Sequence, residues 1–167
     1  AFSDFQCRPC QKFFLESFPL LKTDFIDHGK LKFIYRDFPV GSHLHAKRAA
    51  QLAHCAGEQG LYWPMFSLLS ENRLELEAGH VEAIAAKLAQ ANQEKLAKCL
   101  QSTKYEREIE RDAAEGKSIG AKGAPGFFAG REGPDGELRG VFIRGAQPYP
   151  VLKAEIEKLL AIEPATK

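Results

Sequence analysis

Two cysteines near the start of the chain are separated by two residues, in the segment Cys7-Arg8-Pro9-Cys10. The segment follows a short strand-like run, Phe2–Phe5, and precedes a stretch from Gln11 to Ile26 with apolar residues at helical spacing. A cysteine at the start of a helix faces unpaired backbone N–H groups and the positive end of the helix dipole. Both favour the thiolate, the form of cysteine that attacks disulfides. The spacing and the placement together predict redox chemistry at Cys7 and Cys10.

The other two cysteines, Cys55 and Cys99, each stand alone within a helical pattern. An even number of cysteines is typical of proteins from oxidising compartments, where this pair would form a structural disulfide. The alternative is that both are buried as small apolar side chains. A zinc site built from all four cysteines is disfavoured, because structural zinc sites usually contain two closely spaced pairs.

The charge balance narrows the classes of partner. The chain of 167 residues carries 23 Lys+Arg and 22 Asp+Glu, for a net charge of +1. This near-neutrality gives no reason to expect binding to nucleic acid or to an anionic membrane. No apolar stretch approaches the roughly 18 residues of a membrane span, and no signal peptide is recognisable. Because the sequence opens within a predicted strand, we expect an upstream segment to have been removed or cleaved.

The chain after the first predicted helix divides into a strand and a long helical block. A helix stop at His28–Lys30 precedes a predicted strand at Leu31–Phe38, whose residues alternate in polarity. Pro39 and Gly41 end this strand. Ser42 is a plausible N-cap for the helical block that follows. The block is predicted to contain helices at 43–60, 61–72, 79–91, 93–101 and 104–116.

Strand signals return near the C-terminus. Runs at Gly126–Ala129 and Leu138–Ile143 are joined by a turn at Gly133–Gly136, and Pro148 introduces a last amphipathic helix. A frayed tail is expected at Glu163–Lys167. The order predicts an α/β chain with a thioredoxin fold, a central mixed β-sheet flanked by helices, carrying an inserted all-helical subdomain. We place the thioredoxin-like domain, with a truncated first strand, at 1–41 and 117–167, and the insertion at 42–116.

Five motifs carry a resemblance to a known family. They keep the family's order and run from end to end of the chain: Phe2-Ser3-Asp4-Phe5-Gln6-Cys7, Tyr35-Arg36-Asp37-Phe38-Pro39, Cys55-Ala56-Gly57-Glu58-Gln59-Gly60, Gly123-Ala124-Pro125-Gly126-Phe127-Phe128 and Gly145-Ala146-Gln147-Pro148-Tyr149. On these motifs the chain resembles the DsbA-like branch of the thioredoxin superfamily. The strand that precedes the first motif in many relatives is missing here.

The resemblance implies a protein thiol:disulfide oxidoreductase that needs no cofactor. It implies action outside the cytoplasm, in the bacterial periplasm or at the exterior of the cell envelope, with the signal or anchor segment outside this chain. The implied partners are thiols of unfolded or partly folded proteins and an unidentified redox partner that resets the dithiol. By position, Cys7 is the exposed nucleophile and Cys10 the buried resolving cysteine. Pro125 matches the cis-proline whose loop faces the dithiol.

Three positions in two segments depart from the family's pattern. DsbA-like proteins usually have proline directly after the first cysteine, whereas this chain has Arg8 and then Pro9, and it has Ala124 where relatives often have threonine or valine. The charge of Arg8 would stabilise a thiolate, while Pro9 removes one N–H donor, so the two effects oppose each other. We favour a disulfide oxidase, because the helical block and the Gln147-Pro148 motif belong to that branch. A reductase or isomerase with the same site is the alternative.

Three further sets of residues have both a functional and a structural interpretation. Asp4 is a candidate proton shuttle for Cys10, or a surface carboxylate near the strand end. His43 and His45 are candidate metal ligands, but their spacing does not place both on one helix face, so capping or surface roles are favoured. The helical block contains three aromatic residues at helical spacing, Tyr62, Trp63 and Phe66. They are candidates for lining a peptide groove, but aromatic residues at this spacing more often belong to the core.

Two rival functions stay open on the sequence. A non-catalytic binding or chaperone module with a thioredoxin-like fold would leave the cysteine pair without a role, so the intact Cys7 and Cys10 argue against it. A glutathione-using transferase of the same superfamily is less favoured still, because those enzymes generally lack the full pair.

Overall fold

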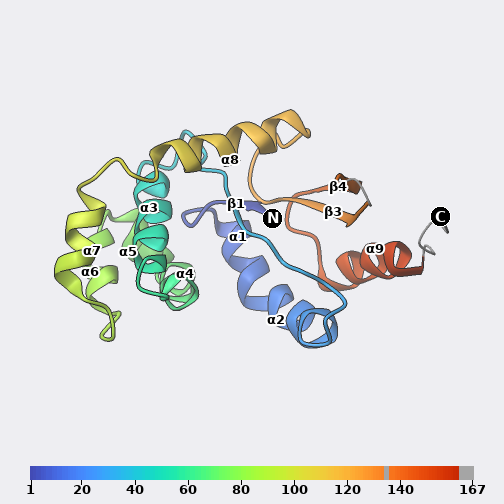
Figure 1. Ribbon diagram of the computed structural model, residues 1–167, viewed down its shortest axis with the longest axis horizontal. Helices are drawn as coiled ribbons and strands as arrows, with labels where there is room; N and C mark the ends of the chain where they lie inside the picture. Colours follow the sequence, from blue (N-terminus) through green and yellow to red (C-terminus); the bar gives the residue numbers. More distant parts are fainter. Residues whose placement is uncertain (134–135, 162–167) are drawn as a thin grey trace.

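The computed structural model describes residues 1–133 and 136–161. In chain order, its elements are β1 (Phe2–Ser3), α1 (Arg8–Lys12), η1 (Phe13–Ser17), α2 (Phe18–Leu21), η2 (Lys22–Ile26), β2 (Arg36–Asp37), α3 (Ala46–Gly57), α4 (Tyr62–Glu71), α5 (Arg73–Glu77), α6 (Val81–Ala86), α7 (Gln93–Leu100), α8 (Glu106–Ser118), β3 (Gly126–Glu132), β4 (Leu138–Arg144) and α9 (Tyr149–Ala161). Helices α3–α7 gather at one end of the molecule, and the β3–β4 hairpin and α9 lie at the other (Figure 1).

The strands form one mixed sheet in the order β2-β1-β3-β4. Strand β1 runs parallel to β2, with Phe2 opposite Arg36, and antiparallel to β3, with Phe2 opposite Gly126. Strands β3 and β4 pair as an antiparallel hairpin from Gly126–Arg144 to Glu132–Leu138. Helix α8 lies on one side of the sheet and α1, α2 and α9 on the other (Figure 1). This four-stranded mixed sheet with flanking helices confirms the predicted thioredoxin fold.

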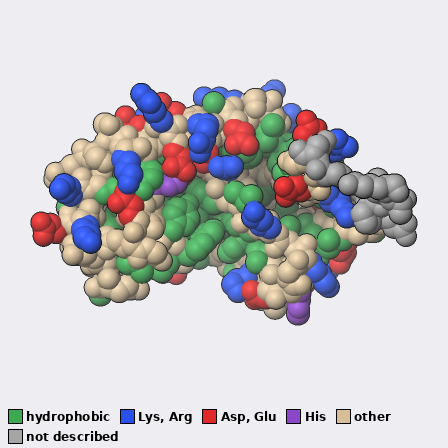
Figure 2. Space-filling model, in the orientation of Figure 1, with side chains coloured by type: hydrophobic (Ala, Val, Ile, Leu, Met, Phe, Trp, Pro, Cys, Tyr) green, Lys and Arg blue, Asp and Glu red, His purple; other side chains and the backbone are tan. Residues whose placement is uncertain are grey.

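Hydrophobic side chains pack against both sides of the sheet. On one side of the sheet, Phe127 of β3 packs against Phe13, with ring centroids 4.5 Å apart. On the other side, Gly116 of α8 permits close approach, because a Cβ there would lie 2.8 Å from the rings of both Phe2 and Phe38. Hydrophobic side chains also gather in the middle of one face, between the helical block and the hairpin end, with charged side chains around them (Figure 2).

The first helical segment begins at Arg8 with Cys7 as its N-cap, which confirms the predicted placement of Cys7 at a helix N-terminus. It includes two π-helical stretches, η1 and η2, on either side of α2. Pro19 lies in the first turn of α2 and has no N–H to donate to the preceding turn, which accounts for the irregular ladder of η1. The predicted stop is confirmed by Gly29, which adopts φ +66°.

The strand predicted at Leu31–Phe38 is mostly wrong, since β2 comprises only Arg36 and Asp37. The side chains from 31 to 35 still alternate between half-buried and exposed, as the sequence pattern predicts. A strand is defined by its ladder, however, and β1 offers β2 only two pairing positions. The pattern therefore fixed which side chains face the core, but not the length of the strand.

Several boundaries in the helical block also differ from the predictions. Ser42 is not the N-cap of the first helix, because α3 begins at Ala46 and His45 occupies the capping position. The helix predicted at 79–91 is shortened to α6, and the short helix α5 was not predicted. The predicted hairpin and the last helix are confirmed. Pro134 and Asp135 of the predicted turn, and the predicted tail at 163–167, lie outside the described residues.

The assignment of residues 42–116 to a separate insertion stays a prediction. Helix α8, at the end of that range, also packs against the sheet, where its Asp112 bonds to Arg36 and to the backbone N–H of Asp37 on β2. The last helix of the block is thus shared with the sheet.

Candidate active site

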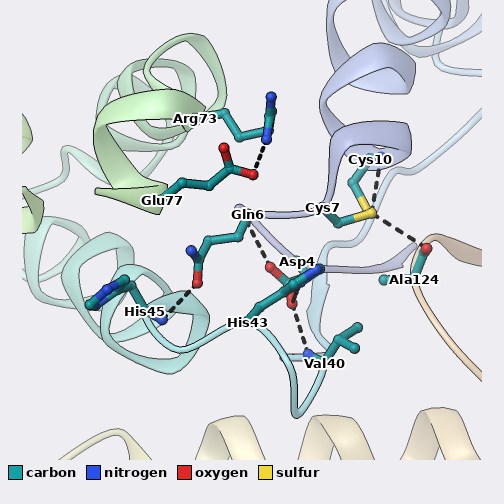
Figure 3. Close-up of polar contacts among 10 residues, drawn as sticks. All are labelled: Asp4, Gln6, Cys7, Cys10, Val40, His43, His45, Arg73, Glu77 and Ala124. Atoms are coloured by element: carbon teal, nitrogen blue, oxygen red, sulfur yellow. Dashed lines mark hydrogen bonds and ion pairs between the residues drawn. A yellow bond between two sulfur atoms is a disulfide. The ribbon is translucent and has the colours of Figure 1, made fainter. Parts of the chain in front are cut away.

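Cys7 and Cys10 are joined in a disulfide at the start of α1. Cys7 is the N-cap residue, with an extended backbone, and its Sγ accepts a hydrogen bond of 3.2 Å from the backbone N–H of Cys10 (Figure 3). This N–H is one of the groups at a helix start that have no partner within the helix. The structure thus places the first sulfur where both a backbone donor and the helix dipole favour a negative charge.

The loop before β3 approaches the same sulfur. The Ala124–Pro125 peptide bond is cis, in agreement with the resemblance. The carbonyl oxygen of Ala124 lies 3.4 Å from Cys7 Sγ, which brings together residues that are 117 positions apart (Figure 3). Pro125 itself is buried.

The exposure of the cysteines differs from the expectation. Cys10 is 1% exposed, as predicted for a buried resolving residue, but Cys7 is also buried, at 3%. The expected exposure of Cys7 is therefore wrong for this disulfide form, because the Ala124 loop and the turn before α1 cover the residue. Arg8 and Pro9 between them are exposed. Solvent around Arg8 weakens any electrostatic effect of its charge on the sulfur.

Asp4 lies beneath the turn that leads to Cys7, and the surface interpretation of this residue is wrong. Its side chain is 0% exposed. The carboxylate accepts hydrogen bonds from the backbone N–H groups of Gln6 and Val40, each at 2.7 Å, and contacts Nδ1 of His43 at 2.8 Å (Figure 3). Asp4 therefore fixes the start of the redox turn against the segment that follows β2.

The two histidines considered as metal ligands point to different partners. The ring of His43 contacts Asp4, while the backbone N–H of His45 donates to Oε1 of Gln6 at 2.6 Å. The ring of His45 lies against Gly79, where a Cβ would come within 3.0 Å of it. Within residues 1–133 and 136–161, no three His, Cys, Asp or Glu side chains converge as a metal site would require.

The aromatic residues of the helical block divide between core and surface. Phe66 is buried and packs edge-to-face on Phe14, with ring centroids 4.7 Å apart. Tyr62 is partly buried against the core, whereas Trp63 is 48% exposed. A cavity of about 500 Å³ lies between segment 30–34, β3 and α9, and none of these three aromatic side chains lines it. The core interpretation is confirmed for Phe66.

Three residues beside the dithiol were not identified from the sequence as site residues. Gln6 and Gln11 flank the cysteine segment, and Arg73 of α5 reaches it from the helical block. The only signal available in the sequence was the presence of an amide side chain on each side of the two cysteines. Arg73 had no such signal, because it lies 62 positions from its partner Gln11.

The second disulfide joins Cys55 of α3 to Cys99 of α7. Cys55 is buried, at 1% exposure, and the two Cα atoms are 5.7 Å apart. Of the two alternatives that the sequence leaves open for this pair, the structure contains the disulfide. A zinc site of all four cysteines is excluded, because the sulfurs are committed to two separate disulfides.

A cluster of charged side chains lies between β2, α3 and α8, and burial and pairing shift the pKa values of its members. Burial opposes the charged form of His54, but its hydrogen bond of 2.6 Å to Asp37 outweighs this and raises the pKa of His54. Burial raises the pKa of Asp112, against the opposing effect of Arg36. Burial also raises the pKa of Tyr35 well above its ordinary value. These interactions link the helical block to the sheet and lie outside the redox turn.

Comparisons with known proteins agree with this geometry. Residues 1–139 match the model of a family described as thioredoxin. The chain is 30% identical over 125 residues to the Na(+)/H(+) antiporter NhaA of Herminiimonas arsenicoxydans, covering 75% of this chain and 19% of that protein. It is 23% identical to the probable disulfide bond formation protein D of Bacillus anthracis, covering 76% of this chain and 62% of that protein. The chain thus spans less than two thirds of either relative.

Among the helices of the described residues, none is both long and apolar enough for a membrane crossing. In three dimensions, the chain superposes on the crystal structure of Wolbachia pipientis α-DsbA1 with a TM-score of 0.81 at 23% identity. The match covers 95% of this chain and 83% of that one. The chain belongs to the thioredoxin family, and its fold is that of the DsbA-like proteins.

Proposed function

We propose that the chain exchanges disulfides with protein substrates through Cys7 and Cys10. The observation that carries the proposal is the disulfide at the start of α1, where the Cys10 N–H group donates to Cys7 Sγ beside the Ala124–Pro125 loop. This is the combination of backbone donor and helix dipole that lowers a thiol pKa and makes a cysteine a good leaving group and nucleophile.

The reaction proceeds by two exchanges at sulfur. A substrate thiolate attacks Cys7 Sγ, a substrate–Cys7 bond forms, the Cys7–Cys10 bond breaks, and Cys10 leaves as a thiolate that takes a proton. A second substrate thiolate then attacks the substrate sulfur of this mixed disulfide and releases the Cys7 thiolate. The substrate loses two electrons to form its disulfide, and the cysteine pair gains them. Access to Cys7 requires the covering loop to yield, since the residue is 3% exposed.

The favoured direction is oxidation of substrate thiols, with a reductase or isomerase as the alternative. Thiolate stabilisation by the Cys10 N–H group supports an oxidising pair. The reduction potential against a glutathione buffer tests the direction. A reduction potential of about −120 mV indicates an oxidase, about −180 mV an isomerase and about −270 mV a reductase. An unreactive disulfide across this whole range would reject the proposal itself.

Asp4 is the proposed proton carrier for this exchange. Its buried carboxylate is bonded to His43, whose side chain is 30% exposed, so the pair connects the base of the redox turn to solvent. An Asp4→Asn substitution keeps the shape and one of the two acceptor oxygens, but it cannot carry the proton. We expect it to slow formation of the mixed disulfide, the step in which Cys10 leaves and takes a proton, while leaving release of the Cys7 thiolate nearly unchanged, measured by quenched-flow alkylation. Equal slowing of both steps would reject the proton role.

The proposed location is outside the cytoplasm, in an oxidising compartment. The Cys55–Cys99 disulfide supports this, because such bonds persist where glutathione and thioredoxin do not reduce them. The proposed partners are reduced, unfolded proteins as substrates and a second protein that accepts the two electrons. Trapping cellular proteins on a Cys10→Ala variant, which cannot resolve the mixed disulfide, would recover both kinds of partner at Cys7. Recovery of cytoplasmic proteins alone would contradict the location.

A further inference from the structure

The cysteine segment is flanked by two glutamines, and both bind the helical block. Gln6 precedes Cys7, and its Oε1 accepts a hydrogen bond of 2.6 Å from the backbone N–H of His45 (Figure 3). Gln11 follows Cys10, and its Nε2 donates a hydrogen bond of 2.6 Å to the backbone carbonyl of Ser70. The two ends of the redox turn are therefore each connected to another helix by a side-chain amide.

The partners of these glutamines belong to well-packed parts of the block. His45 is the capping residue of α3, whose side chains include several that are fully buried. Ser70 lies in the last turn of α4 and is 5% exposed. Backbone atoms at such positions move little, so an amide bound to them fixes the position of the chain that carries it.

Gln11 makes a second contact that fixes the orientation of its amide. Its Oε1 accepts a hydrogen bond of 3.2 Å from Nε of Arg73, while the same guanidinium pairs with Glu77 of α5. Figure 3 shows Arg73 extending from α5 toward the redox turn, with Glu77 beside it. Both polar atoms of the Gln11 side chain are thus occupied by the helical block. A turn this close to the reacting sulfurs is held from two sides.

We propose that Gln6 and Gln11 are positioning residues for the dithiol, which hold the start of α1 so that the Cys10 N–H group stays directed at Cys7 Sγ. The inference rests on the proposed exchange function. A thiolate accepts a stronger hydrogen bond than a disulfide sulfur does, so a well-aligned N–H stabilises the reduced form selectively. Loosening the turn weakens that bond and leaves the pair less oxidising. The helical block contains neither Cys7 nor Cys10, yet it thereby contributes to the reduction potential of this pair.

The test compares Gln6→Ala and Gln11→Ala with a matched control, Gln59→Ala. Gln59 makes the same kind of paired contact within the block, donating to the Asn92 carbonyl at 3.3 Å and accepting from its N–H at 2.8 Å. The readouts are the equilibrium constant with glutathione and the titration of the Cys7 thiolate by its ultraviolet absorbance. A control variant is needed because loss of stability alone would affect all three proteins.

We expect each flanking variant to shift the equilibrium about threefold to tenfold toward the disulfide form, as for the loss of one or two hydrogen bonds. The Cys7 thiolate should titrate at a higher pH, and Gln59→Ala should match the wild type. Should Gln11→Ala fail to fold, Gln11→Glu keeps an oxygen for Arg73 but loses the donor to Ser70. The same measurements on that variant should shift in the same direction.

Two results would overturn the inference while leaving the proposed function intact: flanking variants within twofold of the wild type, or an equal shift in Gln59→Ala. A wild-type protein that does not exchange with glutathione at all would reject the proposed function, and this inference with it.

Discussion

The two disulfides of this chain are chemically alike but lie in different structural surroundings. Cys7 and Cys10 are three positions apart at the start of a helix, with a backbone N–H group and a facing loop against the first sulfur. Cys55 and Cys99 are 44 positions apart and join the middle of one helical block, from α3 to α7. The first disulfide closes a very short loop, whereas the second closes a loop that includes a large part of the helical block.

The surroundings therefore decide what each disulfide does. A helix start stabilises the thiolate that forms when Cys7–Cys10 opens, which makes opening easy. Cys55 lies inside α3 and not at a helix start, so the helix does not stabilise its thiolate in the same way. The main effect of the Cys55–Cys99 bond is to restrict the unfolded chain.

The largest effect should come from Cys7→Ser, which removes the attacked sulfur. We expect disulfide formation in a reduced, unfolded protein to fall to the uncatalysed rate, while the double variant Cys55→Ala/Cys99→Ala retains exchange. Measurement is by recovery of activity in the substrate protein. Undiminished activity in Cys7→Ser would favour a non-catalytic binding module instead.

Stability should show the reverse order. For a loop of about 45 residues, the chain-entropy model gives about 4 kcal/mol for the Cys55–Cys99 bond, as an upper figure. The same model gives about 2 kcal/mol for the loop of Cys7–Cys10. Urea unfolding of Cys55→Ala/Cys99→Ala and of Cys7→Ala/Cys10→Ala measures the difference. Equal losses in the two variants would remove the proposed distinction between a structural and a reactive bond.

Replacing Asp4 by alanine tests the support beneath the redox turn. The substitution leaves the N–H groups of Gln6 and Val40 and the ring of His43 without their acceptor. A buried donor without a partner costs about 1–3 kcal/mol, so we expect a loss of about 3 kcal/mol in the free energy of unfolding. Asp27→Ala is the matched control, because the side chain of Asp27 is in an exposed ion pair with Lys22. A similar small loss in both variants would contradict a structural role for Asp4.

The smallest effect should be a pH dependence from His54 at the junction of block and sheet. Its pKa is raised in the folded state, so its pairing with Asp37 stabilises the fold fully below about pH 6.5 and is lost as pH rises through the higher folded pKa. His54→Gln should lose roughly 1 kcal/mol at pH 5.5 and less at pH 8.5, by urea unfolding. The control is His28→Gln, which replaces an exposed histidine by glutamine as well. A larger loss at the higher pH would have the wrong sign.

Local chemistry in the sequence predicted much of the candidate site. The spacing of Cys7 and Cys10 before a helical pattern indicated the redox turn. Gly29 marked the end of the first helix, where it has a positive φ. Both features depend on a few neighbouring residues, so the local sequence contains the necessary information. The loop of Pro125 was indicated by the family resemblance and not by local chemistry.

Contacts between distant segments could not be obtained in that way. The carboxylate of Asp4 is buried only because the segment at Val40–His43 folds over it. The length of β2 depends on the pairing positions that β1 supplies, and alternation at 31–35 cannot reveal this. The Gln11–Arg73 bond joins residues 62 positions apart, and nothing in either local pattern indicates the other.

The local sequence thus indicates the Cys7–Cys10 turn as the candidate redox site and most of the helices around it, because propensity, spacing and turn chemistry act over short distances. The packing of distant segments adds what holds this turn: Ala124 covers Cys7, Asp4 is buried, and Gln6 and Gln11 bind the helical block. The physical reason is that burial and hydrogen-bond geometry arise when remote segments pack together, and a single sequence does not record which segments will meet.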